Sequence, residues 1–210
     1  MDKEKIGIYG GSFSPIHEGH VRAAVAFLDS MKLDKLLVIP TGNPPHKVID
    51  SATAEERFEM ARLAFCDTEA YKSGRLEISD YEMTREGKSY TVYTLEHFAS
   101  DSRELYMLVG TDMFLSLHKW FRCEDIFALA SIVLVRREND ADKTVQIEEK
   151  KKLYRTDFNA RIFEINEPPT VISSTEIRTI LKDGDGVAEY IPPAVEDYIS
   201  KRNLYKDKNK

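Results

Sequence analysis

Short apolar runs alternate with amphipathic stretches along most of this chain, and this alternation sharply limits the folds open to it. An apolar run at 6–9 ends in two glycines, and a second run at 36–39 is stopped by Pro40. Between them, apolar residues recur at helical spacing from about residue 20 to 31. Strand, helix and strand in sequence make a βαβ unit, which predicts a parallel sheet.

The alternation continues toward the end of the chain. Further strands are predicted at 76–78, 105–109, 132–135 and 161–165, and further helices after a Thr53–Glu56 capping box and at 91–99, 126–130, 173–181 and 195–204. The polar stretch 136–143 is predicted to be a loop. We expect one domain over residues 1–205, followed by a basic tail, 206–210, that frays in solvent.

Composition argues against several classes of protein. Thirty-six acidic against 30 basic residues give a net charge of −6, which disfavours a broad nucleic-acid-binding face. Cys66 and Cys123 are too few for a disulfide scaffold or a zinc finger, and we expect two buried, reduced thiols in a cytoplasmic protein. No apolar run approaches the roughly 20 residues of a membrane span, and the N-terminus lacks a signal peptide's apolar region.

The strongest candidate for phosphate binding follows the first strand, in Gly10-Gly11-Ser12-Phe13-Ser14-Pro15-Ile16-His17-Glu18-Gly19-His20. Ligands of open α/β sheets gather at the carboxyl ends of strands, beside helix N-termini that favour anions. The two glycines allow close approach of a phosphate, and both histidines can donate hydrogen bonds to it. The histidines alternatively cap local backbone, or form a metal pair that lacks a third ligand nearby. The dinucleotide fingerprint and the P-loop pattern are both absent.

Two further segments follow strands. The loop 40–47 contains prolines that stiffen it and can aim His46 and Lys47 at the same crevice, although a plain turn explains the loop equally well. Asp112 follows the strand 105–109, where a carboxylate can accept ribose hydroxyl bonds. Trp120, next to Phe121, can stack on a flat heterocycle, and a core role for Trp120 is an equal alternative.

A second phosphate site is predicted where the helix 173–181 begins. Ser173 and Glu176 fit a capping box. Ser174 and Thr175 then lie in the first turn and Arg178 one turn later, so hydroxyls, N–H groups and a guanidinium converge. The capping box alone does not account for Arg178 or for the run of hydroxyls.

Together these segments resemble the bacterial nicotinate-mononucleotide adenylyltransferases of the HxGH nucleotidyltransferase superfamily. Residues 10–20 resemble the GGSFDPIHxGH loop, 44–47 the PPHK element, Gly110–Asp112 with Trp120 the G-x-D and W elements, and 172–178 the ISSTxIR signature. The resemblance covers residues 6 to about 200. One departure is Ser14, where the family usually carries Asp or Asn.

The resemblance implies a Rossmann-like, doubly wound parallel sheet flanked by helices, with a small C-terminal helical segment. It also implies a reaction in which ATP and nicotinate mononucleotide give deamido-NAD and pyrophosphate, by in-line attack of the mononucleotide phosphate on the α-phosphate. That reaction needs no protein nucleophile, and Mg²⁺ would travel on the ATP phosphates without a protein cage, so no metal-binding residue is predicted.

The family's motifs carry site roles over to matching positions here. His17, His20, Lys47 and Arg178 are expected to be catalytic. ATP is expected to contact Gly10, Gly11, Ser12, Phe13, His17, His20, Ser174, Thr175 and Arg178. The mononucleotide is expected to contact His46, Lys47, Tyr90, Thr91, Asp112, Trp120 and Phe121, with its pyridine ring on Trp120 and its carboxylate at Ser89-Tyr90-Thr91.

Two other functions are weighed against this one. A relative acting on nicotinamide mononucleotide or phosphopantetheine is the nearer rival, although His17 disfavours phosphopantetheine because those enzymes usually carry threonine there. A nucleotide sensor without turnover is the other, and it need not keep both His20 and Arg178. No nucleic-acid or membrane partner is expected, and a homo-oligomer is left open.

Overall fold

Six parallel strands form one sheet in the part of the chain that the computed structural model describes, residues 3–44, 52–136, 143–166 and 172–206. The strands are β1 (Glu4–Gly11), β2 (Lys35–Pro40), β3 (Leu76–Ile78), β4 (Arg103–Gly110), β5 (Ala130–Arg136) and β6 (Ile162–Asn166). Their order is β3-β2-β1-β4-β5-β6, and every neighbouring pair is parallel. This order confirms the predicted Rossmann-like, doubly wound sheet.

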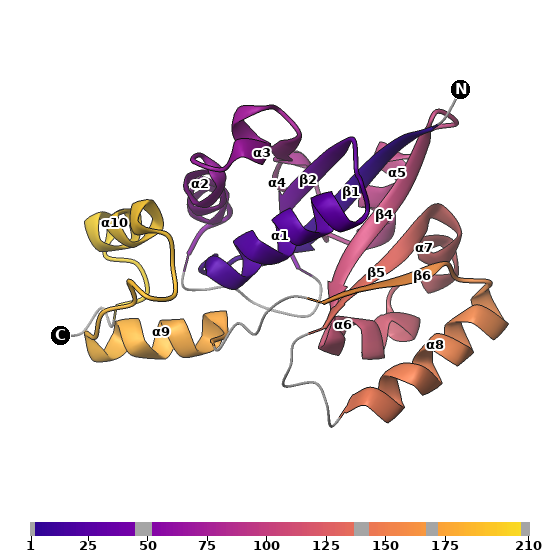
Figure 1. Ribbon diagram of the computed structural model, residues 1–210. Coiled ribbons are helices and arrows are strands. Elements are labelled where there is room, and N and C mark those ends of the chain that lie inside the picture. Colours follow the sequence, from indigo (N-terminus) through magenta and orange to yellow (C-terminus); the bar gives the residue numbers. More distant parts are fainter. Residues whose placement is uncertain (1–2, 45–51, 137–142, 167–171, 207–210) are drawn as a thin grey trace.

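Helices cover both faces of the sheet (Figure 1). They are α1 (Glu18–Ser30), α2 (Ala54–Phe65), α3 (Glu69–Lys72), α4 (Tyr81–Thr84), α5 (Thr91–Phe98), α6 (Thr111–Ser116), the 3-10 helix η1 (Leu117–Lys119), α7 (Cys123–Leu129), α8 (Thr144–Phe158), α9 (Ser174–Asp183) and α10 (Pro193–Arg202). Both predicted capping boxes are present, Thr53 with Glu56 and Ser173 with Glu176.

Alternate residues of each strand enter two separate cores. Leu36 and Val38 join the core under α1, α2, α9 and α10, whereas Leu37 and Ile39 join the core under α5, α6, α7 and α8. Because successive side chains of a strand point to opposite faces, a strand buried on both faces needs an unbroken apolar run. This explains the run at 36–39 that predicted β2.

Several boundaries differ from the predictions. Ala130 begins β5 instead of ending a helix, and α7 starts at Cys123, three residues before the predicted start. The short helices α3, α4 and α6 were not predicted, because four to six residues are too few to establish a helical period. Arg136 belongs to β5, and the rest of the predicted loop, except Lys143, lies outside the described residues.

The remaining expectations concern the cysteines, the domain boundaries and membrane spans. Cys66 and Cys123 are free thiols, but they are half-buried, so the prediction of full burial was wrong. Both stand at helix ends, where one side of the residue faces out. The prediction of one domain over 1–205 stays a prediction, and the tail beyond Lys206 lies outside the described residues. None of the described helices combines the length and apolar character that crossing a bilayer requires.

Candidate active site

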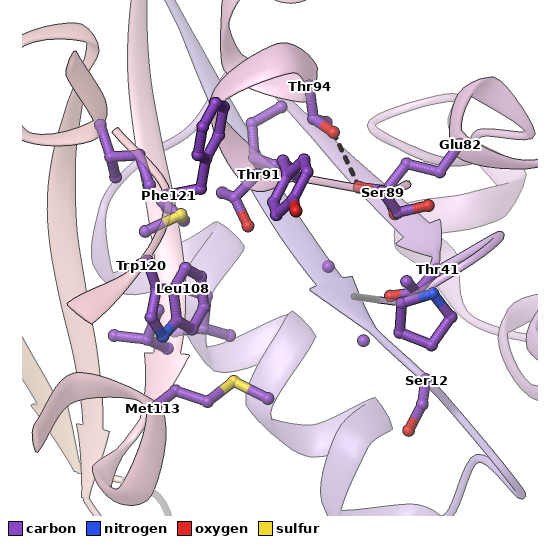
Figure 2. A pocket seen from close by; sticks show the side chains of 18 residues that line it. Ser12, Thr41, Glu82, Ser89, Thr91, Thr94, Leu108, Met113, Trp120 and Phe121 are labelled. Carbon is purple, nitrogen blue, oxygen red and sulfur yellow. Dashed lines mark hydrogen bonds between the residues drawn. The ribbon is translucent and has the colours of Figure 1, made fainter. Parts of the chain in front are cut away.

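Two neighbouring cavities open where the strand order reverses, between β1 and β4. The loop cavity, about 230 Å³, is lined by Tyr9, Gly10, Gly11, Ser12, Phe13, Gly19, His20, Ala23, Leu108, Gly110, Thr111, Asp112, Met113 and Val135. The aromatic cavity, about 310 Å³, is lined by Ile8, Gly10, Gly11, Ser12, Thr41, Pro44, Glu82, Ser89, Tyr90, Thr91, Thr94, Met107, Leu108, Val109, Met113, Trp120, Phe121 and Ile126 (Figure 2). The end of β1 lines both, which is where doubly wound sheets bind ligands.

The two histidines lie against each other at the start of α1. His17 is the N-cap residue and is buried, and its ring centroid lies 3.7 Å from that of His20. The backbone N–H of His17 donates to Nδ1 of His20 at 3.2 Å. His20 therefore caps backbone, as the structural alternative held, and it also lines the loop cavity. With Nδ1 accepting, a neutral His20 carries its proton on Nε2, which can donate to an anion.

The two glycines before this loop serve different purposes. A Cβ on Gly10 would meet nothing within 4 Å, so this backbone faces open space in which a ligand fits. A Cβ on Gly11 would lie 2.8 Å from the ring of Phe13, so Gly11 makes room for that ring. Phe13 lines the loop cavity, but its side chain is buried in the core, edge-on to Tyr9 and His20.

Asp112 lies in the loop cavity with His20, and not in the aromatic cavity with Trp120. It stands in the first turn of α6, which begins directly after β4. Its exposed carboxylate forms an ion pair with Lys143 at 2.7 Å. The structure thus separates Asp112 from the described residues of the predicted mononucleotide group, Tyr90, Thr91, Trp120 and Phe121.

The aromatic cavity brings together the other described members of that group. Tyr90 is the N-cap of α5 and Thr91 its first residue, so the predicted helix start is confirmed. The rings of Tyr90 and Phe121 lie 4.5 Å apart, and Phe121 stays 44% exposed at the rim. Trp120 lines the same cavity and also packs against the core, so the core alternative is confirmed, whereas stacking on a heterocycle stays a prediction.

Glu82, which the sequence did not single out, also lines the aromatic cavity. Its Oε1 accepts a hydrogen bond from the Thr94 hydroxyl at 2.7 Å (Figure 2), and its Oε2 is buried without a hydrogen-bond partner. Burial raises the pKa of this carboxyl, while Thr94, Ser89 and the backbone of Gly42 lower it in part. A single glutamate in a short polar segment carries no local signal that would have identified it.

The start of α9 is attached to the glycine loop. Ser174 donates to the Pro15 carbonyl at 2.9 Å, and Arg178 donates to the Ser14 carbonyl at 2.6 Å. A second guanidinium nitrogen of Arg178 donates to the Thr175 hydroxyl at 3.0 Å. These three residues line neither the loop cavity nor the aromatic cavity, so their predicted contact with ATP phosphates stays a prediction.

Arg57 connects two loops at the carboxyl ends of β1 and β2. Its guanidinium donates to the Ser12 carbonyl at 3.0 Å and to the Gly42 carbonyl at 3.3 Å. The side chain is 2% exposed, and burial lowers its pKa. The sequence offered no signal for this role, since Arg57 stands in an ordinary amphipathic helix.

Ser14, the departure from the family pattern, is buried and meets a residue from the far end of the chain. Its hydroxyl lies 3.2 Å from the Tyr205 hydroxyl. Burial raises the pKa of Tyr205 to about 12. The uncharged Ser14 side chain is therefore compatible with the uncharged, buried Tyr205 hydroxyl beside it.

His46 and Lys47 lie outside the described residues, although Thr41 and Pro44 just before them line the aromatic cavity. Within the described ranges, no group of three or more His, Cys, Asp or Glu residues is placed to hold a metal ion.

Comparison with known proteins identifies the family. Residues 8–180 match the cytidylyltransferase-like family model. The chain belongs to the cytidylyltransferase-like family. Within this family, it is 34% identical over 203 residues to a protein of Caldicellulosiruptor saccharolyticus named probable nicotinate-nucleotide adenylyltransferase, covering 97% of this chain and 100% of the relative. A relative of the same name from Clostridium kluyveri is 36% identical over 206 residues, covering 96% and 99%.

Solved structures of this cytidylyltransferase-like architecture support the fold. Plasmodium falciparum nicotinic acid mononucleotide adenylyltransferase complexed with NaAD superposes with a TM-score of 0.76 at 22% identity, covering 96% of this chain and 97% of that one. The same enzyme complexed with APC gives 0.75 at 20% identity, with the same coverage. The family resemblance read from the motifs is confirmed by the full-length relatives.

Proposed function

We propose that this protein is a nicotinate-nucleotide adenylyltransferase, which joins ATP and nicotinate mononucleotide to give deamido-NAD and pyrophosphate in NAD biosynthesis. The observation that carries the proposal is the pair of cavities that share Gly10, Gly11 and Ser12. One has a histidine and a helix start suited to phosphates, and the other has aromatic rings and a second helix start. Two substrates bound there would meet at the end of β1.

The chemistry asks little of the protein beyond position and charge. An oxygen of the mononucleotide phosphate attacks the α-phosphorus of ATP, and the bond from that phosphorus to the bridging oxygen of pyrophosphate breaks. Because the attacking oxygen is already anionic, no protein base or nucleophile is required. The protein's contribution is alignment and stabilisation of charge that moves onto the leaving pyrophosphate.

In this proposal the loop cavity binds ATP. The Nε2–H of His20 donates to a phosphate oxygen, and the backbone around Gly10 lies close to the phosphates. Mg²⁺ enters on the ATP phosphates, where it would neutralise charge, since the described residues offer no cage of their own. Asp112, which lines the same cavity, would accept a hydrogen bond from a hydroxyl group of the nucleotide.

The mononucleotide occupies the aromatic cavity. Its pyridine ring stacks on Trp120 and its carboxylate accepts hydrogen bonds at the start of α5, from Tyr90 and Thr91. His46 and Lys47 follow shortly after Pro44 in the sequence, Pro44 lines this cavity, and we assign both residues to the mononucleotide phosphate. A cytoplasmic location, where ATP and mononucleotides are held, is part of the proposal.

Pyrophosphate release tests the proposal directly. Purified protein is incubated with ATP, Mg²⁺ and, in separate reactions, nicotinate mononucleotide, nicotinamide mononucleotide or phosphopantetheine. We expect release with nicotinate mononucleotide and deamido-NAD as the coupled product. Release only with another acceptor would favour the corresponding relative, and ATP binding without release would favour a sensor.

A further inference from the structure

A buried carboxyl group stands in the cavity that the proposed function assigns to an anionic substrate. Glu82 is 9% exposed, with Oε1 bonded to Thr94 and Oε2 buried without a hydrogen-bond partner. Figure 2 shows Glu82 and Ser89 on one side of the aromatic cavity and Trp120 and Phe121 on the other. With the mononucleotide bound as proposed, the pyridine substituent would share this cavity with the Glu82 carboxyl group.

The charged side chain that lines this cavity disfavours the binding of an anion. Among its described lining residues, Glu82 is the one carboxyl group, and there is no lysine, arginine or histidine. A carboxylate on the pyridine ring would thus face an acidic group, and the part of the chain that the structure describes places no cation in the lining of this cavity. Two carboxylates in one site cannot both stay ionised without cost, and the usual outcome is that one of them binds a proton.

The groups packed around Glu82 do not remove this conflict. Arg57 of α2 and Arg85 at the end of α4 interact with its charge. However, Arg57 is hydrogen-bonded to the Ser12 and Gly42 carbonyls, and the guanidinium of Arg85 lies over the Tyr93 ring, 4.3 Å from its centroid. The hydroxyls of Thr94 and Ser89 and the backbone of Gly42 also lower the pKa of Glu82, but burial outweighs them all and leaves it raised.

We propose that Glu82 is a specificity-determining residue that takes up one proton from solvent when nicotinate mononucleotide binds, and none when nicotinamide mononucleotide binds. This role rests on the proposed function, because it requires the acid to occupy the aromatic cavity. The proton goes to Oε2, since Oε1 accepts the Thr94 bond. The complex then holds a neutral Glu82 beside the substrate carboxylate.

Uptake of one proton makes affinity depend on pH. As the pH rises above the pKa of Glu82 in the free protein, affinity for the acid falls by about tenfold per pH unit. Nicotinamide mononucleotide has the same ring, ribose and phosphate, so titration of the phosphate affects both ligands alike. The ratio of the two affinities therefore isolates Glu82.

Calorimetry in two buffers measures the proton directly. Each mononucleotide is titrated into the protein in phosphate and in Tris, which differ in their heats of ionisation. For the wild type, we expect the binding heat of nicotinate mononucleotide to depend on the buffer more strongly than that of nicotinamide mononucleotide. The excess should reach at most the difference in ionisation heat between the two buffers for one proton. Glu82→Gln, which keeps the shape but cannot ionise, should lose this excess. Glu86→Gln, which removes an exposed charge four residues away, should keep it.

Three results would overturn this role. Equal buffer dependence for both ligands in the wild type is the first, and an excess retained in Glu82→Gln is the second. If Glu82→Gln fails to fold, the ratio of the wild-type affinities for the acid and the amide is measured from about pH 5 to about pH 9. A ratio that does not change with pH is the third result that would overturn the role. Absence of nicotinate mononucleotide binding contradicts the proposed function itself, whereas binding without excess proton uptake contradicts this role alone.

Discussion

His20 combines a structural and a proposed chemical task in one ring. Its Nδ1 accepts the His17 N–H, which fixes the orientation of the ring at the start of α1. The opposite nitrogen then carries the hydrogen that the loop cavity can use. A residue held this way loses little freedom when it binds phosphate, which is what preorganised stabilisation of a leaving group requires.

Removing this donor should slow the reaction without unfolding the protein. We expect His20→Ala to lower kcat by roughly 10²–10³, the scale for losing one preorganised donor to developing charge. Pyrophosphate release measures the rate, and circular dichroism checks the fold. His97→Ala, at an exposed histidine stacked on Tyr81, is the matched control and should keep near wild-type turnover. A folded His20→Ala variant with wild-type kcat would contradict the phosphate role.

Substitutions at Trp120 and Thr91 should distinguish recognition of the pyridine ring from recognition of its carboxylate. Stacking involves the flat face of the ring, so Trp120→Ala should weaken both mononucleotides by roughly 10- to 100-fold. Thr91→Val keeps the side-chain volume and removes a hydroxyl, which should cost mainly the acid, by about tenfold or more. The kcat/KM for each mononucleotide tests this. Equal losses for acid and amide in Thr91→Val would refute the placement of the carboxylate.

Helices α2 and α9 hold the glycine loop from two sides through backbone carbonyls. Arg57 binds the carbonyl of Ser12, and Arg178 binds that of Ser14. Each arginine places a positive charge beside the loop and donates a hydrogen bond to one of its carbonyl oxygens. Loop geometry at the proposed ATP site therefore depends on two helices that are distant in sequence.

Arg178→Ala should weaken ATP and pyrophosphate more than the mononucleotide, since α9 contacts the glycine loop and not the aromatic cavity. We expect a loss of about tenfold or more in ATP affinity by calorimetry. Arg178→Lys should restore only part of it, because a lysine cannot bond the Ser14 carbonyl and Thr175 through one planar fork. Unchanged ATP affinity in the alanine variant would exclude both a direct and a positioning role.

The C-terminal segment contacts the glycine loop through Tyr205. Tyr205 reaches Ser14 across 191 positions of sequence and is 4% exposed. Its neutral form is favoured in the fold, because burial raises its pKa to about 12. In the unfolded chain a tyrosine ionises near pH 10. The folded state therefore holds the proton more tightly, and stability that is fully present below about pH 10 is lost as the pH rises toward about 12.

This linkage gives a measurable difference between wild type and Tyr205→Phe. Between about pH 9 and about pH 11, the wild type should lose on the order of 1 kcal/mol more of its unfolding free energy than the variant, which has no hydroxyl to ionise. Denaturant unfolding at each pH measures it. Tyr106, whose pKa burial also raises, is present in both proteins and cancels. Parallel pH curves for the two proteins would show that Tyr205 is not linked to folding.

Interactions within a few residues made much of the fold predictable. The apolar runs that became β2, β4 and β5 are buried on both faces, so each carried an unbroken signal. Two capping boxes marked helix starts, because the cap side chain and its partner are three residues apart. The glycine loop could be assigned to the carboxyl side of the sheet because it directly follows a predicted strand, whereas Ser89–Thr91 was assigned to the substrate carboxylate only through the family resemblance.

Contacts between distant segments could not be predicted in this way. Whether Asp112 lies with His20 or with Trp120 depends on how α6 leaves β4, and the sequence-based assignment grouped it with Trp120, whereas in the structure it lines the loop cavity with His20. Hydrogen bonds between separate elements connect Glu82, Arg57 and Tyr205 to the site. No residue spacing in the sequence predicts these hydrogen bonds. A hydrogen bond between distant residues exists only once the backbone brings donor and acceptor to about 3 Å. Local propensity therefore specified the elements, whereas their packing specified which side chains share a cavity.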